Sequence, residues 1–220
     1  MSSQPAGRLR VGVIGAGPVG TVLGQALAAA GHQLVAENTK DPQATLAEAD
    51  LVLFAIPAEE IAGTVAGYAK AGLFKPGQLI AHTAGEFGID VLQPAFEQGV
   101  IPLAIHPAMS FTGTDLDLTR IRESYFGVAA PEVALPIAQA LVIEMGAEPI
   151  VISEEDRKIY FEAISVANNF SKLIVNQSIG LLESIGIEHA RVVLGPLIRS
   201  AVEEALADGH TPINPEELLS

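Results

Sequence analysis

The chain has no cysteine among its 220 residues. This absence excludes disulfides, thiolate nucleophiles, iron–sulfur clusters and cysteine-based zinc sites. Basic residues are also scarce, since 12 Lys and Arg stand against 26 Asp and Glu and leave a net charge of −14. A charge of that sign argues against a nucleic acid or an anionic membrane as the partner.

Long hydrophobic runs and internal repeats are missing too. Residues 1–8 contain no apolar segment typical of a secretion signal, and no later run approaches the length that crosses a bilayer. We therefore expect a cytoplasmic protein with no membrane partner and a short disordered leader at residues 1–8. Because 49% of the residues are hydrophobic, the rest of the chain can bury a sizeable core.

A glycine-rich turn is the most informative feature that the sequence does contain. Gly15, Gly17 and Gly20 fit the pattern G-x-G-x-x-G, between an apolar stretch at Leu9–Ile14 and a helical stretch at Thr21–Ala30. In such a turn the first glycine permits a tight bend, the second lets a pyrophosphate approach, and the third lets helix and strand pack closely. The helix N-terminus adds free N–H groups and a partial positive charge. The predicted cofactor-binding residues here are Gly15, Ala16, Gly17, Pro18 and Val19, the alternative being a purely structural turn.

Apolar runs of strand length recur through the first two-thirds of the chain. They are continuous rather than alternating, which indicates strands covered on both faces and hence a mainly parallel sheet flanked by helices. The predicted strands are Leu9–Ile14, Gln33–Ala36, Asp50–Ile56, Gln78–His82, Val100–Ile105, Tyr125–Ala129 and Glu148–Ile152, with a helix at Pro131–Met145. The predicted fold class is therefore α/β, with a Rossmann-type dinucleotide-binding domain over residues 9–152.

The pattern changes at Ser153, which together with the following acids is typical of a helix start. Apolar residues then recur at helical spacing as far as Ile185. A second helical stretch covers Glu188–Asp208, with an expected interruption at Gly195-Pro196. Residues 153–220 form a small helical domain, so we expect its apolar faces to be buried in a homodimer.

The end of the second predicted strand bears on the choice between NAD and NADP. NAD sites usually place an acidic residue there to bind the adenosine ribose. In this chain the ribose-facing position falls on the neutral Asn38 rather than on Glu37. Asn38, Thr39 and Lys40 would accept a 2′-phosphate that a carboxylate would repel. These residues favour NADP, and the alternative is a solvated turn in which Lys40 pairs with Asp41.

Three further turns follow predicted strands, at Ala55–Pro57, His82–Gly85 and Ile105–Phe111. Ligands of open parallel sheets bind beyond the carboxyl ends of the strands, so we expect these turns to converge with the glycine turn on one site. The further cofactor contacts predicted there are Ile56, Pro57, Thr83 and Ala84.

His82 and His106 are the candidate catalytic residues in these turns. Reduction of a carbonyl or imine needs a proton as well as a hydride, and a histidine can supply it near neutral pH. For each histidine the alternatives are a hydrogen bond that fixes the loop, which we favour for His82, or the positioning of a substrate carboxylate. Two histidines without ligand spacing do not make a metal site, and none is predicted.

Taken together, the four turns resemble those of the 6-phosphogluconate-dehydrogenase-like superfamily, which includes pyrroline-5-carboxylate reductases. The chain is most similar to Rossmann-like proteins whose helical part is a domain of unknown function 2520, because His82-Thr-Ala-Gly85 and His106-Pro107 occur in the same order. The resemblance covers nearly the whole chain and implies an NAD(P)-dependent oxidoreductase with a small-molecule substrate. Tyr160-Phe161 departs from the Tyr-His pair that is common in that family.

A polar stripe marks the first long helical stretch, where Asn169, Lys172 and Asn176 are spaced i, i+3 and i+7. Lys172 and Asn176 resemble the Lys–Asn pair with which β-hydroxyacid dehydrogenases bind and protonate their substrates. The resemblance implies a catalytic role for Lys172 and substrate contacts for Asn169 and Asn176. The alternative is a stripe that faces solvent.

The function predicted from the sequence is hydride transfer to or from a small polar ketone or imine that carries a carboxylate. NADP is the favoured cofactor, with NAD or F420-linked NADP chemistry as alternatives. The competing hypothesis is a non-catalytic dinucleotide-binding protein that acts as a redox sensor or interaction module.

Overall fold

The computed structural model describes residues 8–36 and 41–209. The chain divides into two compact units, Met1–Ile164 and Ser165–Ser220. The division falls after the predicted start of the helical domain at Ser153. The reason is that the first turns of helix α7 (Arg157–Ser184) belong to the first unit, where Tyr160 is hydrogen-bonded to a strand residue, His106.

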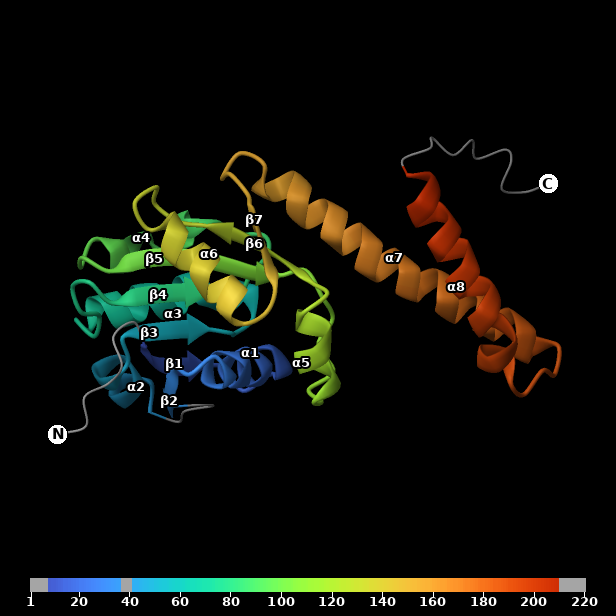
Figure 1. The fold of residues 1–220 in the computed structure, drawn as a ribbon, viewed down its shortest axis with the longest axis horizontal. Coiled ribbons are helices and arrows are strands. Elements are labelled where there is room, and N and C mark those ends of the chain that lie inside the picture. The colour runs from blue at the N-terminus through green and yellow to red at the C-terminus, as the bar shows by residue number, and fades with distance from the viewer. Residues whose placement is uncertain (1–7, 37–40, 210–220) are drawn as a thin grey trace. The chain divides into compact units, whose positions relative to one another are not determined.

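One seven-stranded sheet organises the first unit, in the order β2-β1-β3-β4-β5-β6-β7 (Figure 1). Strands β5 and β6 are antiparallel, and the other neighbouring strands run parallel. The predicted α/β fold with a mainly parallel sheet is confirmed. The strands are β1 (Arg10–Ile14), β2 (Gln33–Ala36), β3 (Leu51–Phe54), β4 (Leu79–His82), β5 (Ile101–Pro107), β6 (Tyr125–Ala129) and β7 (Glu148–Val151).

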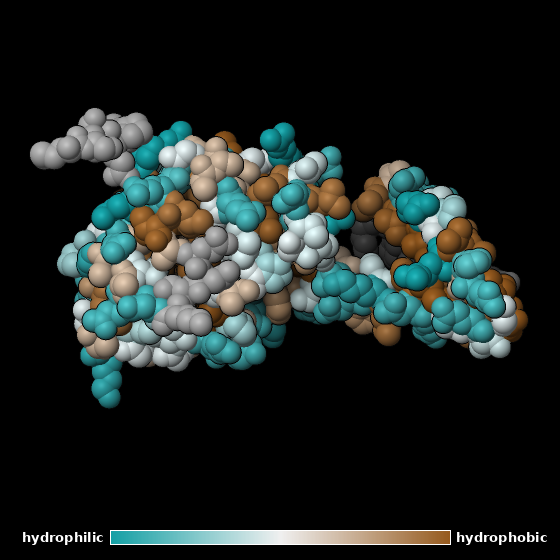
Figure 2. Space-filling model, turned by 90° about the horizontal axis from the view of Figure 1, so that it is seen from below, coloured by the Kyte–Doolittle hydropathy of each residue, from teal (hydrophilic) through white to brown (hydrophobic). Residues whose placement is uncertain are grey.

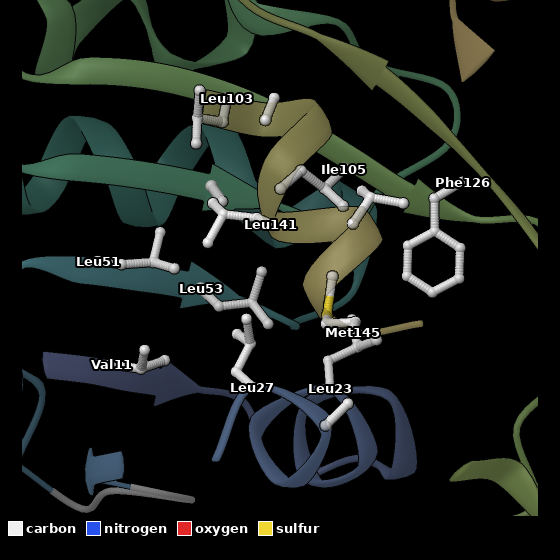
Figure 3. Close-up of a cluster of buried hydrophobic side chains, with 14 of the residues drawn as sticks. Val11, Leu23, Leu27, Leu51, Leu53, Leu103, Ile105, Phe126, Leu141 and Met145 are labelled. Atoms are coloured by element: carbon white, nitrogen blue, oxygen red, sulfur yellow. The ribbon is translucent and has the colours of Figure 1, made fainter. Parts of the chain in front are cut away.

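Helices cover both faces of this sheet, which explains why the strands are hydrophobic throughout. Leu51 and Leu53 of β3 point into a core shared with helices α1 and α6 (Figure 3). The intervening Val52 and the following Phe54 point into a second core, beneath α2, α3 and α4. The helices of this unit are α1 (Pro18–Ala29), α2 (Pro42–Glu48), α3 (Ala58–Lys70), α4 (Gln93–Phe96), α5 (Leu116–Ile121) and α6 (Leu135–Glu144), with a 3-10 turn η1 (Ile89–Leu92).

The second unit consists of the greater part of α7 and of helix α8 (Ala190–Asp208). The predicted interruption at Gly195-Pro196 is wrong, because α8 continues through Pro196. A proline inside a helix leaves the carbonyl four residues earlier without its N–H partner. That residue is Val192, which is 75% exposed, so water can satisfy its carbonyl. In the parts of the chain that the structure describes, no helix has the length and apolar character needed to cross a membrane.

The carboxyl ends of the parallel strands meet at one edge of the sheet. Ile14, Phe54, His82 and Ala104 are aligned in register across β1, β3, β4 and β5. Strand β5 runs on to Pro107 and carries His106 beyond the end of β4. The turns after these strands therefore begin side by side, as predicted from the sequence.

Candidate functional site

Two of the three motif glycines are required by the packing of the chain itself. Gly15 has φ +137°, and a Cβ there would collide with the carbonyl oxygen of Ala55. A Cβ on Gly20 would lie 2.8 Å from Cγ1 of Val13, so only glycine lets α1 approach β1 this closely. These contacts shape the turn between β1 and α1 without involving any ligand.

Gly17 is different, because the fold gives no reason for its lack of a side chain. Its φ of −85° suits any residue, and a Cβ there would meet no atom of the described residues within 4 Å. Gly17 is also the N-cap of α1, and within the described chain no side chain caps the helix. The first-turn N–H groups of α1, of which Pro18 has none, therefore have no side-chain partner at the helix N-cap. This arrangement fits an anion such as a pyrophosphate, which needs both the free N–H groups and the space.

His82 is completely buried at the end of β4. Its Nε2 donates a hydrogen bond to the carbonyl oxygen of Gly88 at 2.8 Å, which leaves Nδ1 as an acceptor with no partner among the described residues. Burial lowers the pKa of His82 from 6.5 to about 4; the bond to Gly88 opposes this shift, and the charges of Arg157 and His106 add to it. His82 is therefore neutral near pH 7 and fixes the turn that follows β4.

His106 forms a pair with Tyr160, which the sequence analysis did not select. The Nδ1 atom of His106 lies 2.8 Å from the Tyr160 hydroxyl, and the rings pack edge to face with centroids 5.5 Å apart. Burial lowers the pKa of His106 to about 4, and the charge of Arg157 contributes to the shift. Burial likewise raises the pKa of Tyr160, although Arg157 and the backbone of Gly127 oppose this change. A neutral phenol and a neutral imidazole meet here, so we assign the proton of this hydrogen bond to the Tyr160 hydroxyl. Nδ1 is then the acceptor, and the single N–H of the neutral imidazole is on Nε2.

The Nε2 atom of His106 faces the turn after β4. A Cβ on Gly85 would lie 2.7 Å from this nitrogen and 2.8 Å from Cδ2 of Phe161. Glycine at position 85 therefore allows the His82–Gly85 turn to approach the Nε2–H group closely. The predicted cofactor contacts Thr83 and Ala84 lie in this same turn, and Ala84 is buried.

Arg157 is the second functional residue that the sequence analysis missed. Its side chain is only 2% exposed, and its guanidinium carbon lies 5.8 Å from the centroid of the Tyr160 ring. Arg157 is the first residue of α7, a position where the positive end of the helix dipole disfavours a cation. That mismatch is the sequence signal that could have identified it.

A cavity of about 430 Å³ borders Tyr160. The residues that line it are Ala108, Met109, Arg120, Glu123, Ser124, Tyr125, Ile150, Tyr160 and Ile164. Neither His106 nor Arg157 is among them, so this cavity does not include the Nε2–H group that faces Gly85.

The other predicted site residues fall into three groups. Ile56 and Pro57 follow β3, where Pro57 is the exposed N-cap of α3. Asn38, Thr39 and Lys40 lie outside the described residues. The predicted polar stripe lies on α7 in the second unit, and its three side chains, Asn169, Lys172 and Asn176, are exposed. Across residues 8–36 and 41–209, no cluster of three or more His, Cys, Asp or Glu side chains is arranged to hold a metal ion.

Comparison with known proteins relates both parts of the chain to described families. Residues 2–45 and 37–107 match a Rossmann-like domain. Residues 124–213 match the domain of unknown function DUF2520. Among curated proteins, none matches the chain.

Solved structures with a similar fold cover most of the chain. A proposed NADP oxidoreductase from Bacteroides fragilis has a TM-score of 0.72 at 22% identity, over 90% of this chain and 80% of its own. A pyrroline-5-carboxylate reductase from Streptococcus pyogenes has a TM-score of 0.66 at 15% identity, over 96% of this chain and 84% of its own. The Plasmodium falciparum pyrroline carboxylate reductase with NADP bound has a TM-score of 0.61 at 13% identity, over 96% of this chain and 82% of its own. The two family matches, one after the other along the chain, confirm the expected similarity to Rossmann-like proteins whose second part is a DUF2520 domain.

Proposed function

We propose that this protein is an oxidoreductase that transfers a hydride between a nicotinamide dinucleotide and a small polar ketone or imine. The observation that carries the proposal is Gly17, which combines an absent side chain, open space and an uncapped helix N-terminus. The fold supports it, because the similar Plasmodium falciparum structure is a reductase with NADP bound. The nicotinamide, when bound, would supply or accept the hydride.

The proton that accompanies the hydride would come from His106. With a pKa of about 4, its ring is neutral near pH 7, so it acts as a neutral donor through Nε2–H. Transfer of this proton to the substrate oxygen or nitrogen leaves Nε2 bare. The Tyr160 hydroxyl, 2.8 Å from Nδ1, would pass its own proton to Nδ1 in the same step, so that the ring stays neutral and the negative charge moves to the Tyr160 oxygen, which then regains a proton from solvent. His82 serves as a positioning residue, because its Nε2 is already bonded to the carbonyl of Gly88.

The cofactor is NADP rather than NAD in this proposal. The argument rests on Asn38, Thr39 and Lys40, which offer an amide, a hydroxyl and an ammonium group where NAD sites usually carry a carboxylate. Comparison of the affinities for NADPH and NADH tests the preference directly.

A homodimer through α7 and α8 is the form in which we expect the protein to work. The helices of the second unit expose large apolar side chains (Figure 2), each between 49% and 78% accessible. They are Val166, Phe170, Leu173, Ile174, Leu181, Val192, Leu197 and Leu206. Apolar surface of this extent on a soluble protein typically marks an interface, and a second copy would cover it.

Calorimetric titration of the purified protein with NADPH tests the function. The Gly17→Val variant places a side chain in the open space before α1, where it contacts no described residue. We expect its affinity for NADPH to fall by about 100-fold or more, because the pyrophosphate can no longer approach the backbone. The melting temperature should change little. Gly67→Val is the matched control, because a Cβ at Gly67 in α3 also meets no atom of the described residues within 4 Å. Unchanged affinity in the Gly17 variant, or no binding of NADPH or NADH by the unaltered protein, would overturn the proposal.

A further inference from the structure

The guanidinium of Arg157 is buried and has no hydrogen-bond partner within the described part of the chain. Its Nε, Nη1 and Nη2 atoms are all inaccessible to solvent, and none of them is hydrogen-bonded to any of the described residues. A guanidinium carries five N–H donors and a charge that cannot be lost near neutral pH. Burying such a group unpaired is costly, so its position calls for a ligand that carries negative charge.

Among the described residues, no acidic side chain is hydrogen-bonded to this guanidinium. Glu154 is the acid that acts electrostatically on Arg157, but its Oε1 accepts a hydrogen bond from the backbone N–H of Ile89 at 2.7 Å. The charge of Arg157 also acts on His82 and His106, and both are neutral near pH 7. The face of Tyr160 offers only the weaker attraction of an aromatic ring.

The position of Arg157 identifies which ligand would bring the charge. Arg157 lies near the histidines of β4 and β5, whereas the glycine turn follows β1, and β3 separates β1 from β4. Neighbouring strands lie about 4.8 Å apart, so roughly 10 Å or more separates β1 from β4 and β5. A pyrophosphate held at Gly17 therefore leaves Arg157 unpaired. The missing anion belongs to the molecule that receives the proton from His106.

We infer that Arg157 binds a carboxylate of the substrate, so that this protein acts on ketones or imines that carry a carboxylate, such as 2-oxo acids and cyclic imino acids. The inference rests on the proposed function and adds to it the group that selects the substrate. A carboxylate matches the planar fork of a guanidinium through two parallel hydrogen bonds. A monoanionic carboxylate also balances the single positive charge of Arg157, whereas a phosphate dianion carries a second negative charge that this one guanidinium does not balance.

Ligand binding to the NADP⁺-loaded protein tests this inference without turnover. The probes are pyruvate and the cyclic imino acid pyrroline-2-carboxylate, each compared with its neutral amide, and inorganic phosphate as a separate anion. We expect the unaltered protein to bind at least one carboxylate about 100-fold more tightly than the matching amide, because two charge-assisted hydrogen bonds are at stake. Arg157→Met should reduce the affinity for the carboxylate to that for the amide and leave the NADP⁺ affinity within about twofold.

Two further variants separate the role of Arg157 from general effects. Arg157→Lys keeps the charge but loses the fork, so it should recover part of the preference, and it replaces the Met variant if that one does not fold. Lys158→Met removes a neighbouring but exposed cation and should change nothing. The apo Arg157→Met protein should melt no earlier than the unaltered protein, because an unpaired buried charge has been removed.

The outcomes distinguish the two proposals. Carboxylate affinity that survives Arg157→Met within about twofold, a phosphate preferred over every carboxylate, or no preference for a carboxylate over its amide overturns the inference about Arg157. In each of these cases intact NADP⁺ binding leaves the proposed function standing. Loss of cofactor binding in the unaltered protein would instead contradict the proposed function itself.

Discussion

Two histidines with lowered pKa values, His82 and His106, make the stability of the protein depend on pH in a predictable direction. His82 and His106 have pKa values of about 4 in the folded protein, against 6.5 as the ordinary value. At pH values between about 4 and 6.5, the unfolded chain binds more protons at these two histidines than the folded protein does. The stabilisation from the neutral rings is therefore complete above pH 6.5 and is lost as the pH falls towards 4.

The size of the effect follows from the two shifts. At a pH of about 5.5, an unfolded histidine is largely protonated while each buried one is still neutral. The difference lowers the free energy of unfolding by about 1.4 kcal/mol for each histidine relative to a pH of about 8, or about 3 kcal/mol for both. Asp50 and Asp117 do not contribute in this window, because their pKa values are lowered below 3.8.

Urea unfolding of the apo protein at these two pH values and at constant salt measures the loss. His82→Gln keeps an amide donor for the Gly88 carbonyl, and His106→Asn keeps an acceptor for Tyr160, while both remove the titrating ring. Each variant should lose about half of the pH dependence and the double variant nearly all of it, whatever the substitutions cost in absolute stability. His189→Gln, at an exposed position, is the control and should retain the dependence. An equal loss of stability in the double variant and the unaltered protein would refute the assignment of buried neutral imidazoles.

Two further predictions concern the proton donor and the assembly. Tyr160→Phe removes the hydroxyl that returns a proton to Nδ1, so steady-state kinetics should show kcat lowered about 10- to 100-fold with NADPH affinity unchanged; a loss of cofactor affinity alone would assign Tyr160 to structure. In sedimentation experiments the unaltered protein should be a dimer. The double variant Leu181→Glu with Leu197→Glu should have a dimer dissociation constant that is higher by about tenfold or more. Glu183→Gln is the control for the second experiment, and a monomeric unaltered protein would contradict the assembly.

Local patterns were sufficient to predict most of the fold. The uninterrupted hydrophobicity of segments such as Leu51–Phe54 predicts strands covered on both faces, and the structure buries alternate residues in two separate cores. The glycine turn and the two histidine turns were placed correctly at one edge, because residues that follow parallel strands necessarily gather there. The continuity of α8 through Pro196 was harder to predict, since the cost of a proline inside a helix depends on whether the carbonyl that it frees is exposed.

The pairings within the site could not be predicted in the same way. Tyr160 meets His106 across 54 residues of sequence, and no local pattern encodes a contact of that range. Whether His82 faces solvent or is buried depends on the packing of the whole sheet edge, and its pKa follows from that burial. The cation at the start of α7 marks Arg157 as unusual in the sequence, but the burial of its guanidinium depends on how the helix start packs against the sheet.

The overhang of β5 beyond β4 has a consequence for how this protein can change its specificity. His106 lies on a paired strand opposite Gly127 of β6, so main-chain hydrogen bonding holds it in place, independently of the neighbouring turns. The turn after β4 and the start of α7, which carry Gly85 and Arg157, can therefore change in sequence while His106, the proposed proton donor, stays where it is. A scaffold of this kind could accept new substrates through substitutions in these two segments while the position of His106 is kept.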